Sequence, residues 1–492
     1  MNIAIIGAGL AGLTAAYELG KLSESEEFSE DLRVDVYEAT DRIGGKLFTV
    51  PFEVGPTDMG AEAFMARRRD AVEFFRSLGL GESLVEPSGL GSLVYVDGHT
   101  QPLPHAGIMG IPSSSEPVAH LVSAETAARI DAEGQQPGFA WEIGGDANVG
   151  TLVRGRYGDE VVDNIVTSLL GGVYSCAADD LGVRATIPQL ANELDRLAAA
   201  SVSAGGASEA HLSEAVRNLE NARTQLPTGQ GAVFNTFREG YQELYEALAE
   251  QSGADIYIDS FISGIQLAGK GSDKDGGVPK YRLKGGENVE YDAVILAVPA
   301  PTAALLLKQV APQAADALSS VKLANSAVVG MRFATDEGLP QNSGVLVASG
   351  ANDVHAKAFT FSSRKWPHLA ERGGALVRAS FGRFGDDIAL RSSEDDLVDW
   401  ALDDLLTIAG FDGRAAGLEE IYVQRWFGGL PRFDEHHLDT VARVRDLLGQ
   451  APEAAGVYTT GAWVGGVGVP AVIAHARAEA AGAATQIRER LR

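Results

Sequence analysis

The chain has 492 residues, 45% of them hydrophobic, and its 67 acidic residues outnumber 40 basic ones to give a net charge of −27. This predicts a large protein of two or three domains, each with a sizeable core. The acidic balance argues against nucleic acid as a ligand and against a broad hold on anionic lipid, because both require basic surface. The single cysteine, Cys176, excludes an intrachain disulfide and fits a reducing compartment. We expect it to be buried rather than catalytic.

No segment has 18 consecutive apolar residues, so we expect no transmembrane helix. The apolar stretch near the start lacks the basic leader of a signal peptide, which predicts a cytoplasmic protein. His436 and His437 are adjacent, but no second ligand cluster at zinc-like spacing accompanies them, so no metal site is expected.

Residues 1–12 read as a short apolar strand that runs directly into Gly7, Gly9 and Gly12. This G-x-G-x-x-G spacing is typical of a turn that opens a helix at the pyrophosphate of a dinucleotide. Gly7 permits the tight turn, Gly9 lets the backbone approach the phosphates, and Gly12 lets the helix pack on its strand. The alternative is a glycine-rich turn without a ligand.

The next predicted strand, Arg33 to Tyr37, ends in Glu38. Its carboxylate is suited to accept hydrogen bonds from a ribose 2′-OH and would repel a 2′-phosphate. The polar stretch from Ser23 to Asp31 explains why Glu38 follows the glycines later than usual, as a longer helix-to-strand connection. Asp41 to Lys46 then adds a second glycine pair and two cations, which could reach the pyrophosphate from its other side.

The middle of the chain, from about residue 85 to 225, lacks alternating strand signals. It has helical patterning instead, as in Gly158 to Leu170 and Ile187 to Ala200. Ser201 to Ser208 is small and polar, which predicts a surface connection. We interpret this block as an inserted, mostly helical domain.

Strand patterns return after this block. Ile256 to Leu267 and Lys280 to Leu283 are strand-like and flank the polar, glycine-rich Gly269 to Gly277, which predicts a hairpin tip. Tyr291 to Pro299 has the continuous apolar character of a strand that is covered on both faces.

The last predicted elements are a strand, Val457 to Gly461, and an alanine-rich helix, Val469 to Arg492, which should begin at Pro470. The predicted fold class is α/β, with a Rossmann-like nucleotide-binding domain built from discontinuous segments. The expected domains are this nucleotide-binding domain (1–84, 228–300 and 440–492), the mostly helical inserted domain (85–227) and a mixed α+β substrate domain (301–439).

The glycine pair after Glu38 resembles the GG-doublet of the flavoproteins that include amine oxidases, phytoene desaturases and porphyrinogen oxidases, which bind FAD with this segment. Other segments resemble porphyrinogen oxidases, and most of all the bacterial branch that oxidises coproporphyrinogen III. In chain order they are residues 58–68, 102–112, 158–174, 364–368, 425–431 and 461–470. The resemblance covers essentially the whole chain.

The resemblance implies FAD as the cofactor. Lys46 stands where the family usually has Arg, which keeps the charge but loses the bidentate fork. Gly60 would let the backbone run along the flavin, and Ile262 would cover an adenine face. Trp426 could equally be a core aromatic. The implied cofactor-binding residues are Gly7, Ala8, Gly9, Leu10, Ala11, Gly12, Glu38, Ala39, Arg42, Gly45, Lys46, Gly60, Ala61, Glu62, Ala63, Ile262, Trp426, Val467, Gly468 and Val469.

The implied reaction is the oxidation of coproporphyrinogen III to coproporphyrin III in haem biosynthesis. Three two-electron hydride transfers would run from the macrocycle to flavin N5, and O2 would be reduced to H2O2. No side chain is predicted to be catalytic, because the flavin carries the hydride. Ferrochelatase is a candidate acceptor of the product.

Arg67 and Arg68 belong to the densest basic cluster of the chain and are predicted to bind substrate propionates. The alternative is a solvated helix start. Gly171 and Gly172 would let the backbone approach a flat macrocycle. Residues 173–176 read Val-Tyr-Ser-Cys where similar proteins typically read Val-Tyr-Ala-Gly, which predicts a slightly tighter pocket.

Three other functions stay open from the sequence. Protoporphyrinogen IX oxidation would use the same fold and flavin with two propionates to bind. Amine or carotenoid oxidation would suit the wider superfamily, although only Trp463 stands near the last glycine cluster as part of an aromatic cage. The third is a non-catalytic protein that binds FAD and a partner.

Overall fold

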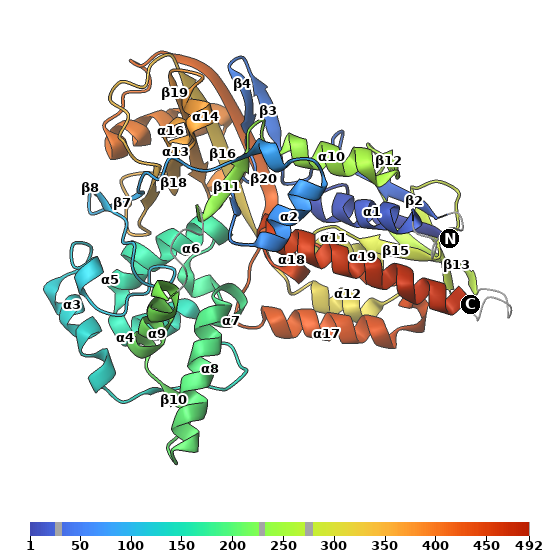
Figure 1. Ribbon diagram of the computed structural model, residues 1–492, viewed down its shortest axis with the longest axis horizontal. Coiled ribbons are helices and arrows are strands. Elements are labelled where there is room, and N and C mark those ends of the chain that lie inside the picture. Colours follow the sequence, from blue (N-terminus) through green and yellow to red (C-terminus); the bar gives the residue numbers. More distant parts are fainter. Residues whose placement is uncertain (25–31, 226–231, 271–278, 492) are drawn as a thin grey trace. The chain divides into compact units, whose positions relative to one another are not determined.

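The computed structural model describes residues 1–24, 32–225, 232–270 and 279–491 (Figure 1). The chain forms two compact units. Unit 1 comprises Met1–Glu86, Gly231–Lys322 and Asp439–Arg492, and unit 2 comprises Pro87–Gln230 and Leu323–Leu438. Three distant segments therefore build unit 1, and the nucleotide-binding domain over residues 1–84, 228–300 and 440–492 stays a prediction. The separation of unit 2 into a helical and a substrate domain stays a prediction.

Unit 1 contains a five-stranded sheet in which every pair of neighbours is parallel. This confirms the α/β class, because parallel strands require crossover connections that place helices on the sheet faces. In spatial order the strands are β12 (Asp255–Tyr257), β2 (Arg33–Tyr37), β1 (Asn2–Ile6), β15 (Ala293–Leu296) and β21 (Val457–Thr459).

Successive side chains of β1 point to opposite faces of this sheet and enter two different cores. Ile3 and Ile5 pack on one side, and Ala4 and Ile6 on the other. Three helices that lie side by side cover the first face, namely α1 (Leu10–Ser23), α10 (Gln242–Ser252) and α19 (Val469–Leu491) (Figure 1). The second face is covered by α11 (Ala300–Leu307), α12 (Pro312–Leu318) and α17 (His437–Gln450).

Short elements complete unit 1. They are the hairpin β3 (Thr49–Phe52) and β4 (Gly55–Asp58), the small sheet β5 (Phe64–Met65), β11 (Phe234–Phe237) and β6 (Leu84–Val85), and the helices α2 (Arg69–Ser77), η2 (Gly81–Ser83), η8 (Pro452–Ala454) and α18 (Ala462–Gly465).

The expected hairpin is confirmed by β13 (Gly264–Lys270) and β14 (Pro279–Lys284), which pair antiparallel. Most of its predicted tip, residues 271–277, lies outside the described residues. The prediction of one strand over Ile256 to Leu267 is wrong. The extended run breaks at Asp259, which has a φ of 51°, so β12 belongs to the parallel sheet and β13 to the hairpin.

Unit 2 contains a seven-stranded sheet in which only the pair β17 and β7 is parallel. Its strands, in spatial order, are β20 (Leu418–Pro431), β16 (Leu323–Phe333), β19 (Ala375–Phe381), β18 (Ala358–Thr360), β17 (Gly344–Val347), β7 (Leu93–Val96) and β8 (His99–Pro102). Helix α16 (Glu394–Ala409) packs its apolar side chains on this sheet. The Ser393 hydroxyl caps this helix by accepting the Asp396 N–H at 3.0 Å.

Helices dominate residues 116–224 of unit 2, as expected. The prediction that Ser201 begins a connection is wrong, because small residues continue α8 to Ser203. The helices are η3 (Glu116–Val118), α3 (Ala124–Asp131), η4 (Glu133–Gln135), α4 (Val149–Tyr157), α5 (Asp159–Val161), the π-helical turn η5 (Val162–Val166), α6 (Thr167–Tyr174), η6 (Ala178–Asp180), α7 (Val183–Thr186), α8 (Pro188–Ser203) and α9 (Leu212–Thr224). A short pair of strands, β9 (Phe139–Ala140) and β10 (Glu209–Ala210), and three short helices, α13 (Ser362–Lys365), α14 (Pro367–Ala370) and α15 (Ile388–Arg391), complete the unit.

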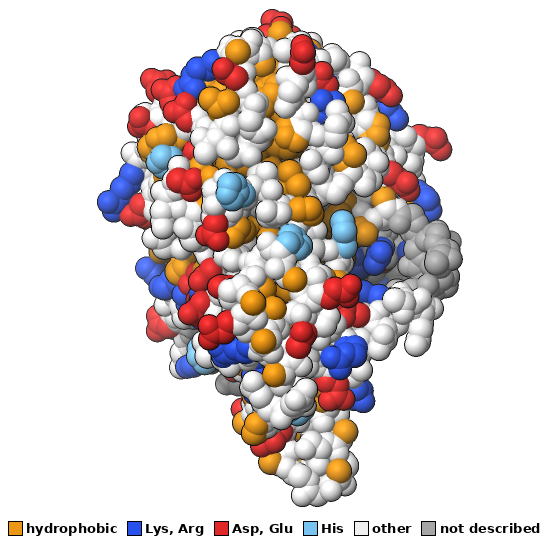
Figure 2. Space-filling view, turned by 90° about the vertical axis from the view of Figure 1, so that its left-hand side faces the viewer, with side chains coloured by type: hydrophobic (Ala, Val, Ile, Leu, Met, Phe, Trp, Pro, Cys, Tyr) orange, Lys and Arg blue, Asp and Glu red, His pale blue; other side chains and the backbone are white. Residues whose placement is uncertain are grey.

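Acidic and basic side chains are interspersed on the face that Figure 2 displays, together with hydrophobic and histidine side chains. No helix of the described part of the chain is long and apolar enough to cross a membrane. Among the same residues, no group of three His, Cys, Asp or Glu side chains could hold a metal ion.

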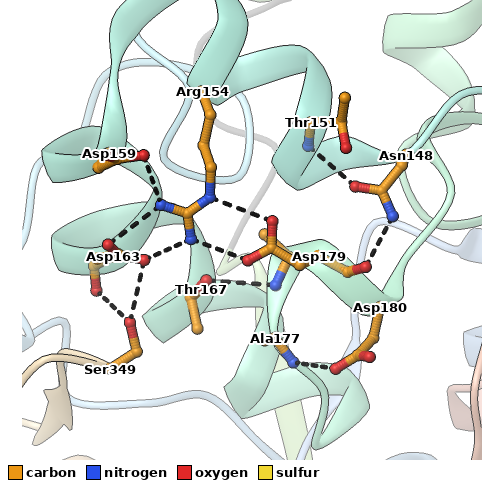
Figure 3. Close-up of polar contacts among 11 residues, drawn as sticks. Asn148, Thr151, Arg154, Asp159, Asp163, Thr167, Ala177, Asp179, Asp180 and Ser349 are labelled. Atoms are coloured by element: carbon orange, nitrogen blue, oxygen red, sulfur yellow. Dashed lines mark hydrogen bonds and ion pairs between the residues drawn. The ribbon is translucent and has the colours of Figure 1, made fainter.

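One arginine forms ion pairs with carboxylates from several helices of unit 2 (Figure 3). Arg154 of α4 donates two hydrogen bonds to Asp163, at 2.6 and 3.1 Å, and two to Asp179, at 2.8 and 3.1 Å. It also donates to Asp159 at 3.0 Å. The Asp163 backbone carbonyl accepts the N–H of Ser349, so the cluster is also joined to the loop after β17. These carboxylates raise the pKa of Arg154, which stays charged.

Replacing Arg154 leaves three carboxylates facing one another without their cation. We expect Arg154→Met to destabilise unit 2 by about 1–3 kcal/mol, because its charged hydrogen bonds are partly shielded from water. The matched control is Arg414→Met. Arg414 also pairs with two aspartates, but its side chain is 48% exposed against 28% for Arg154, so its loss should cost less than about 1 kcal/mol. Chemical denaturation followed by fluorescence measures both; equal losses would contradict the prediction.

Candidate cofactor site

The turn after β1 packs closely against neighbouring segments through backbone atoms. Gly7 has a φ of 104°, and a Cβ added to it would lie 2.6 Å from the carbonyl oxygen of Ala297. Its N–H donates to the Tyr37 carbonyl at 2.7 Å, which joins the turn to the end of β2. Only glycine fits this conformation at this distance.

Helix α1 begins directly on this turn. A Cβ on Gly12 would lie 1.8 Å from the Gly7 carbonyl oxygen, so the helix packs against the turn at backbone distance. Gly9 is the N-cap and has no side-chain capping bond. The N–H groups of Leu10 and Ala11 in the first turn have no acceptor within the helix. They present the positive end of the helix dipole, which suits an anion such as a pyrophosphate.

Glu38 lies beside this turn, as the sequence predicts. Its Oε2 accepts the Ala8 N–H at 2.9 Å, and its Oε1 accepts the N–H and the hydroxyl of Thr40 at 3.0 and 2.9 Å. The backbone of Glu38 pairs with Tyr257 and Ser260, at 2.8 and 2.7 Å. The contact with residues 257–260 is not predicted from the sequence, because these residues lie within a stretch predicted as one strand; the polar Asp259 and Ser260 are the sequence signal for a break there.

The second glycine pair packs on the first glycine turn. Gly44 donates its N–H to the Ala8 carbonyl at 2.9 Å, and a Cβ on Gly45 would lie 2.8 Å from the Gly9 Cα. Backbone from two separate segments therefore meets at the start of α1. This leaves the surface over the helix N-terminus free of side chains from these glycines.

The two cations of the second loop differ in their surroundings. Arg42 donates to the carbonyls of Ile43, Gly45 and Leu47 at 2.8–3.3 Å, so it fixes the shape of the loop. Lys46 makes no hydrogen bond or ion pair with any described residue. Burial lowers the pKa of Lys46 to about 8. An anion bound beside it would raise this pKa and keep the amine charged.

A buried carboxylate holds the segment that contains Gly60. Asp58, at the end of β4, accepts the Tyr241 N–H at 3.0 Å and the Thr49 hydroxyl at 2.5 Å. Tyr241 is the N-cap of α10. A Cβ on Gly60 would lie 2.1 Å from the Lys46 carbonyl oxygen, so residues 60–63 start against the loop that carries Lys46. The sequence analysis did not anticipate the role of Asp58.

The last predicted cofactor segment precedes α19. Gly468 has a φ of 108°, and no atom lies within 4 Å of a Cβ added to it, so its surroundings are open. Helix α19 begins at Val469, one residue before the predicted Pro470. The carboxyl ends of parallel strands meet at one edge of a sheet, so the segments after β1, β2 and β21 leave the sheet at the same edge.

Two predicted residues have surroundings that differ from the expectation. Ile262 is 4% exposed and packs in the core beside Tyr37, whereas its neighbour Phe261 is 67% exposed and offers the larger apolar surface. Trp426 belongs to unit 2, where it is half-buried in β20 and pairs with Ser326. Their contacts with a cofactor stay predictions.

The predicted substrate residues lie in both units. Arg67 and Arg68 are exposed just before α2 in unit 1. Arg68 pairs with Asp70 at 2.6 Å, whereas Arg67 makes no ion pair with any described residue. Gly171 and Gly172 lie in α6 of unit 2, the first buried and the second exposed.

The only cysteine has the expected environment. Cys176 is fully buried, and burial, followed by the nearby Asp180, raises the pKa of its thiol to about 12. The thiol is therefore neutral at physiological pH and does not act as a base or nucleophile.

A parallel sheet with a glycine turn, an acidic strand end and a second glycine pair defines a dinucleotide-binding flavoprotein. Residues 10–484 match the family of flavin-containing amine oxidoreductases. The chain belongs to this family, which confirms FAD as the cofactor and shows that the protein is an oxidoreductase.

Similar proteins confirm the resemblance seen in the sequence. The chain is 38% identical to the coproporphyrinogen III oxidase of Mycobacterium bovis, over 95% of this chain and 94% of that protein. It is 28% identical to the coproporphyrinogen III oxidase of Bacillus subtilis, over 99% and 98%. A protein from Exiguobacterium sp. 255-15, a proposed protoporphyrinogen oxidase, has a crystal structure with a TM-score of 0.80 at 26% identity, covering 99% of both chains. Cyclohexylamine oxidase from Brevibacterium oxydans shares the fold, with a TM-score of 0.65 at 16% identity over 99% of both chains.

The backbone contact between Gly12 and Gly7 can be tested with a single methyl group. We expect Gly12→Ala to yield protein without bound flavin and to lower stability by more than about 2 kcal/mol, because overpacking forces the helix off its turn. The control is Gly482→Ala in α19, where no atom lies within 4 Å of the added Cβ. Alanine there should be neutral or stabilise the helix by up to about 1 kcal/mol. Thermal unfolding and the flavin absorbance per protein measure both effects, and a Gly12→Ala variant with full flavin content would contradict the prediction.

Proposed function

We propose that the protein oxidises coproporphyrinogen III to coproporphyrin III, with O2 as the electron acceptor. The observation that carries this proposal is the 38% identity to coproporphyrinogen III oxidases over 95% of the chain. Each molecule of substrate would consume three O2 and yield three H2O2. The product would pass to a metal-inserting enzyme of haem biosynthesis such as ferrochelatase.

We propose that the N-terminus of α1 binds the pyrophosphate of FAD, with Lys46 facing it from the second loop. The open turn at Gly468 and the start of α19 would lie against the flavin ring, whose pyrimidine side becomes negative on reduction. Glu38 would exchange one of its present hydrogen bonds for a ribose hydroxyl. Residues 60–63 would run along the ring, because the Asp58 anchor holds their backbone.

When bound, FAD supplies the acceptor for hydride from a methylene bridge of the substrate. With each hydride the macrocycle would also lose a proton from a pyrrole nitrogen, and tautomerisation between the three steps would move a hydrogen from the fourth methylene bridge to a nitrogen, so no strong protein base is required. The task of the chain is to bind the propionates and to orient the macrocycle. Arg67 is suited to bind a propionate, because its guanidinium makes no ion pair with any described residue. It can donate two parallel hydrogen bonds to a carboxylate.

Lys46 should report on the bound pyrophosphate. We expect Lys46→Met to weaken FAD binding about tenfold at pH 7, because it removes a charge-assisted contact, whereas Lys46→Arg should stay within about threefold. In the wild type, FAD affinity should fall as the pH rises above about 8, where the free amine loses its proton. Lys46→Arg should remove this fall, since arginine stays protonated.

Titration of the apoprotein with FAD, followed by flavin fluorescence, measures these affinities. Lys21→Met is the control, because Lys21 pairs with Glu24 at the far end of α1. A Lys46→Met variant with wild-type affinity and pH dependence would place the lysine outside the cofactor site.

The function is tested by offering coproporphyrinogen III and protoporphyrinogen IX to FAD-loaded protein and following porphyrin fluorescence and peroxide together. We expect preference for coproporphyrinogen III. We also expect Arg67→Met to raise its KM about tenfold, and Arg68→Met to raise it less, because Asp70 already neutralises Arg68. Preference for protoporphyrinogen IX would assign the sister activity. Turnover of neither would contradict the proposal and direct attention to amines and carotenoids.

A further inference from the structure

Two cations, the buried Lys357 and the half-buried Arg383, lie at one end of the seven-stranded sheet of unit 2. Lys357 precedes β18 and is 6% exposed. Its Nζ donates to the Ser175 hydroxyl at 2.7 Å and to the Gly382 carbonyl at 2.6 Å. Arg383 follows β19 and donates one Nη2 hydrogen bond to the Val347 carbonyl at 3.0 Å. Neither side chain forms an ion pair with a carboxylate of the described residues.

These two charges have no ion-pair partner among the described residues. Burial, followed by the charge of Arg383, lowers the pKa of Lys357 to about 7, and burial also lowers the pKa of Arg383. The Nε of Arg383 is buried without an acceptor. Asp386 attracts both cations from beyond ion-pair distance, and Cys176 nearby is neutral. Buried charges of one sign are costly, and a carboxylate placed between them would offset that cost.

Gly171, the first glycine of the pair in α6, lies against Arg383. A Cβ on Gly171 would be 3.4 Å from the Nε of Arg383, and one on Gly172 would be 3.6 Å from the side chain of Leu346 in β17. Gly172 is exposed and Val173 is 46% exposed, so a ligand can reach this turn of the helix from solvent. With no side chain on the glycines, a flat ligand can approach the helix backbone beside Arg383.

A purely structural role explains Lys357 only in part. Its amine lies at the C-terminal end of α6, where Ser175 has a φ of 52°, and a cation there stabilises the helix dipole. That role does not account for Arg383, whose Nε lies beside Gly171 without an acceptor. Lys357 also retains a third N–H donor beyond its two hydrogen bonds.

We propose that Lys357 and Arg383 form a carboxylate-binding subsite beside Gly171 and Gly172 that binds one propionate of the tetrapyrrole. The subsite rests on the proposed function and deepens it, because it makes these residues determinants of preference for a tetracarboxylate over a dicarboxylate substrate. The macrocycle edge that carries the propionate would lie over the α6 glycines.

The test uses FAD-loaded full-length protein. Coproporphyrin III and protoporphyrin IX, which carry four and two propionates, are titrated by fluorescence, and turnover of both porphyrinogens is measured. We expect Arg383→Gln and Lys357→Met each to weaken coproporphyrin III binding about tenfold and to raise KM for coproporphyrinogen III more than they lower kcat. Binding of protoporphyrin IX should change less. Arg414→Gln, which removes an exposed, paired cation of the same unit, should change neither.

A pH profile separates binding from a structural role. In the wild type, kcat/KM for coproporphyrinogen III should fall above about pH 7, because the free Lys357 loses its proton while Arg383 stays charged. Lys357→Arg should flatten this fall. Flavin content and thermal unfolding identify a variant that does not fold. If Arg383→Gln does not fold, the same binding measurements are made on Arg383→Lys.

The outcomes are distinct. If the wild type oxidises coproporphyrinogen III but the folded variants bind coproporphyrin III normally and keep its pH profile, the subsite is wrong and the proposed function stands. If the wild type oxidises neither porphyrinogen, the proposed function is wrong, and the subsite falls with it.

Discussion

The cofactor site depends on backbone segments that approach more closely than any side chain would allow. Gly12 packs on Gly7, Gly45 packs on Gly9, and Gly60 packs on the Lys46 carbonyl, in each case at a distance that excludes a Cβ. These contacts bring the turn after β1 together with two loops that follow β2. What is left uncovered is the N-terminus of α1, where amide N–H groups and the helix dipole favour an anion. The family match shows that the protein is a flavoprotein, and we propose that the anion at this helix start is the pyrophosphate of FAD.

The sequence predicted the elements with strong local signals. The β1 turn, the strand from Arg33 to Tyr37 and the late strand beginning at Val457 combine apolar runs with glycine or acidic ends, and each lies in the parallel sheet. Contacts between distant segments left no comparable signal. The hydrogen bonds of Asp58 to the start of α10 and of Glu38 to Ser260 join positions far apart in the chain. No periodicity reports such pairs.

The pairing of charged side chains gives a second indication of where ligands bind. The chain is strongly acidic, and cations such as Arg154 and Arg414 are paired with aspartates. Against that background, a cation without an ion pair to any described residue is informative. Lys46 lies beside the predicted pyrophosphate position, and Lys357 and Arg383 lie beside the α6 glycines. In an acidic protein, an anionic ligand gains the most binding free energy beside such cations, since no carboxylate of the described chain forms an ion pair with them.

The order of strands in unit 1 has a consequence for how the protein is made. Strand β1 pairs with β15, nearly three hundred residues later, and β15 pairs with β21 near the end of the chain. During synthesis the N-terminal glycine turn therefore emerges long before its neighbours exist. Folding of this sheet has to wait for the last strand and α19, so long-range pairing dominates and makes it slow. We therefore expect flavin to bind at this turn only after β21 and α19 have been synthesised.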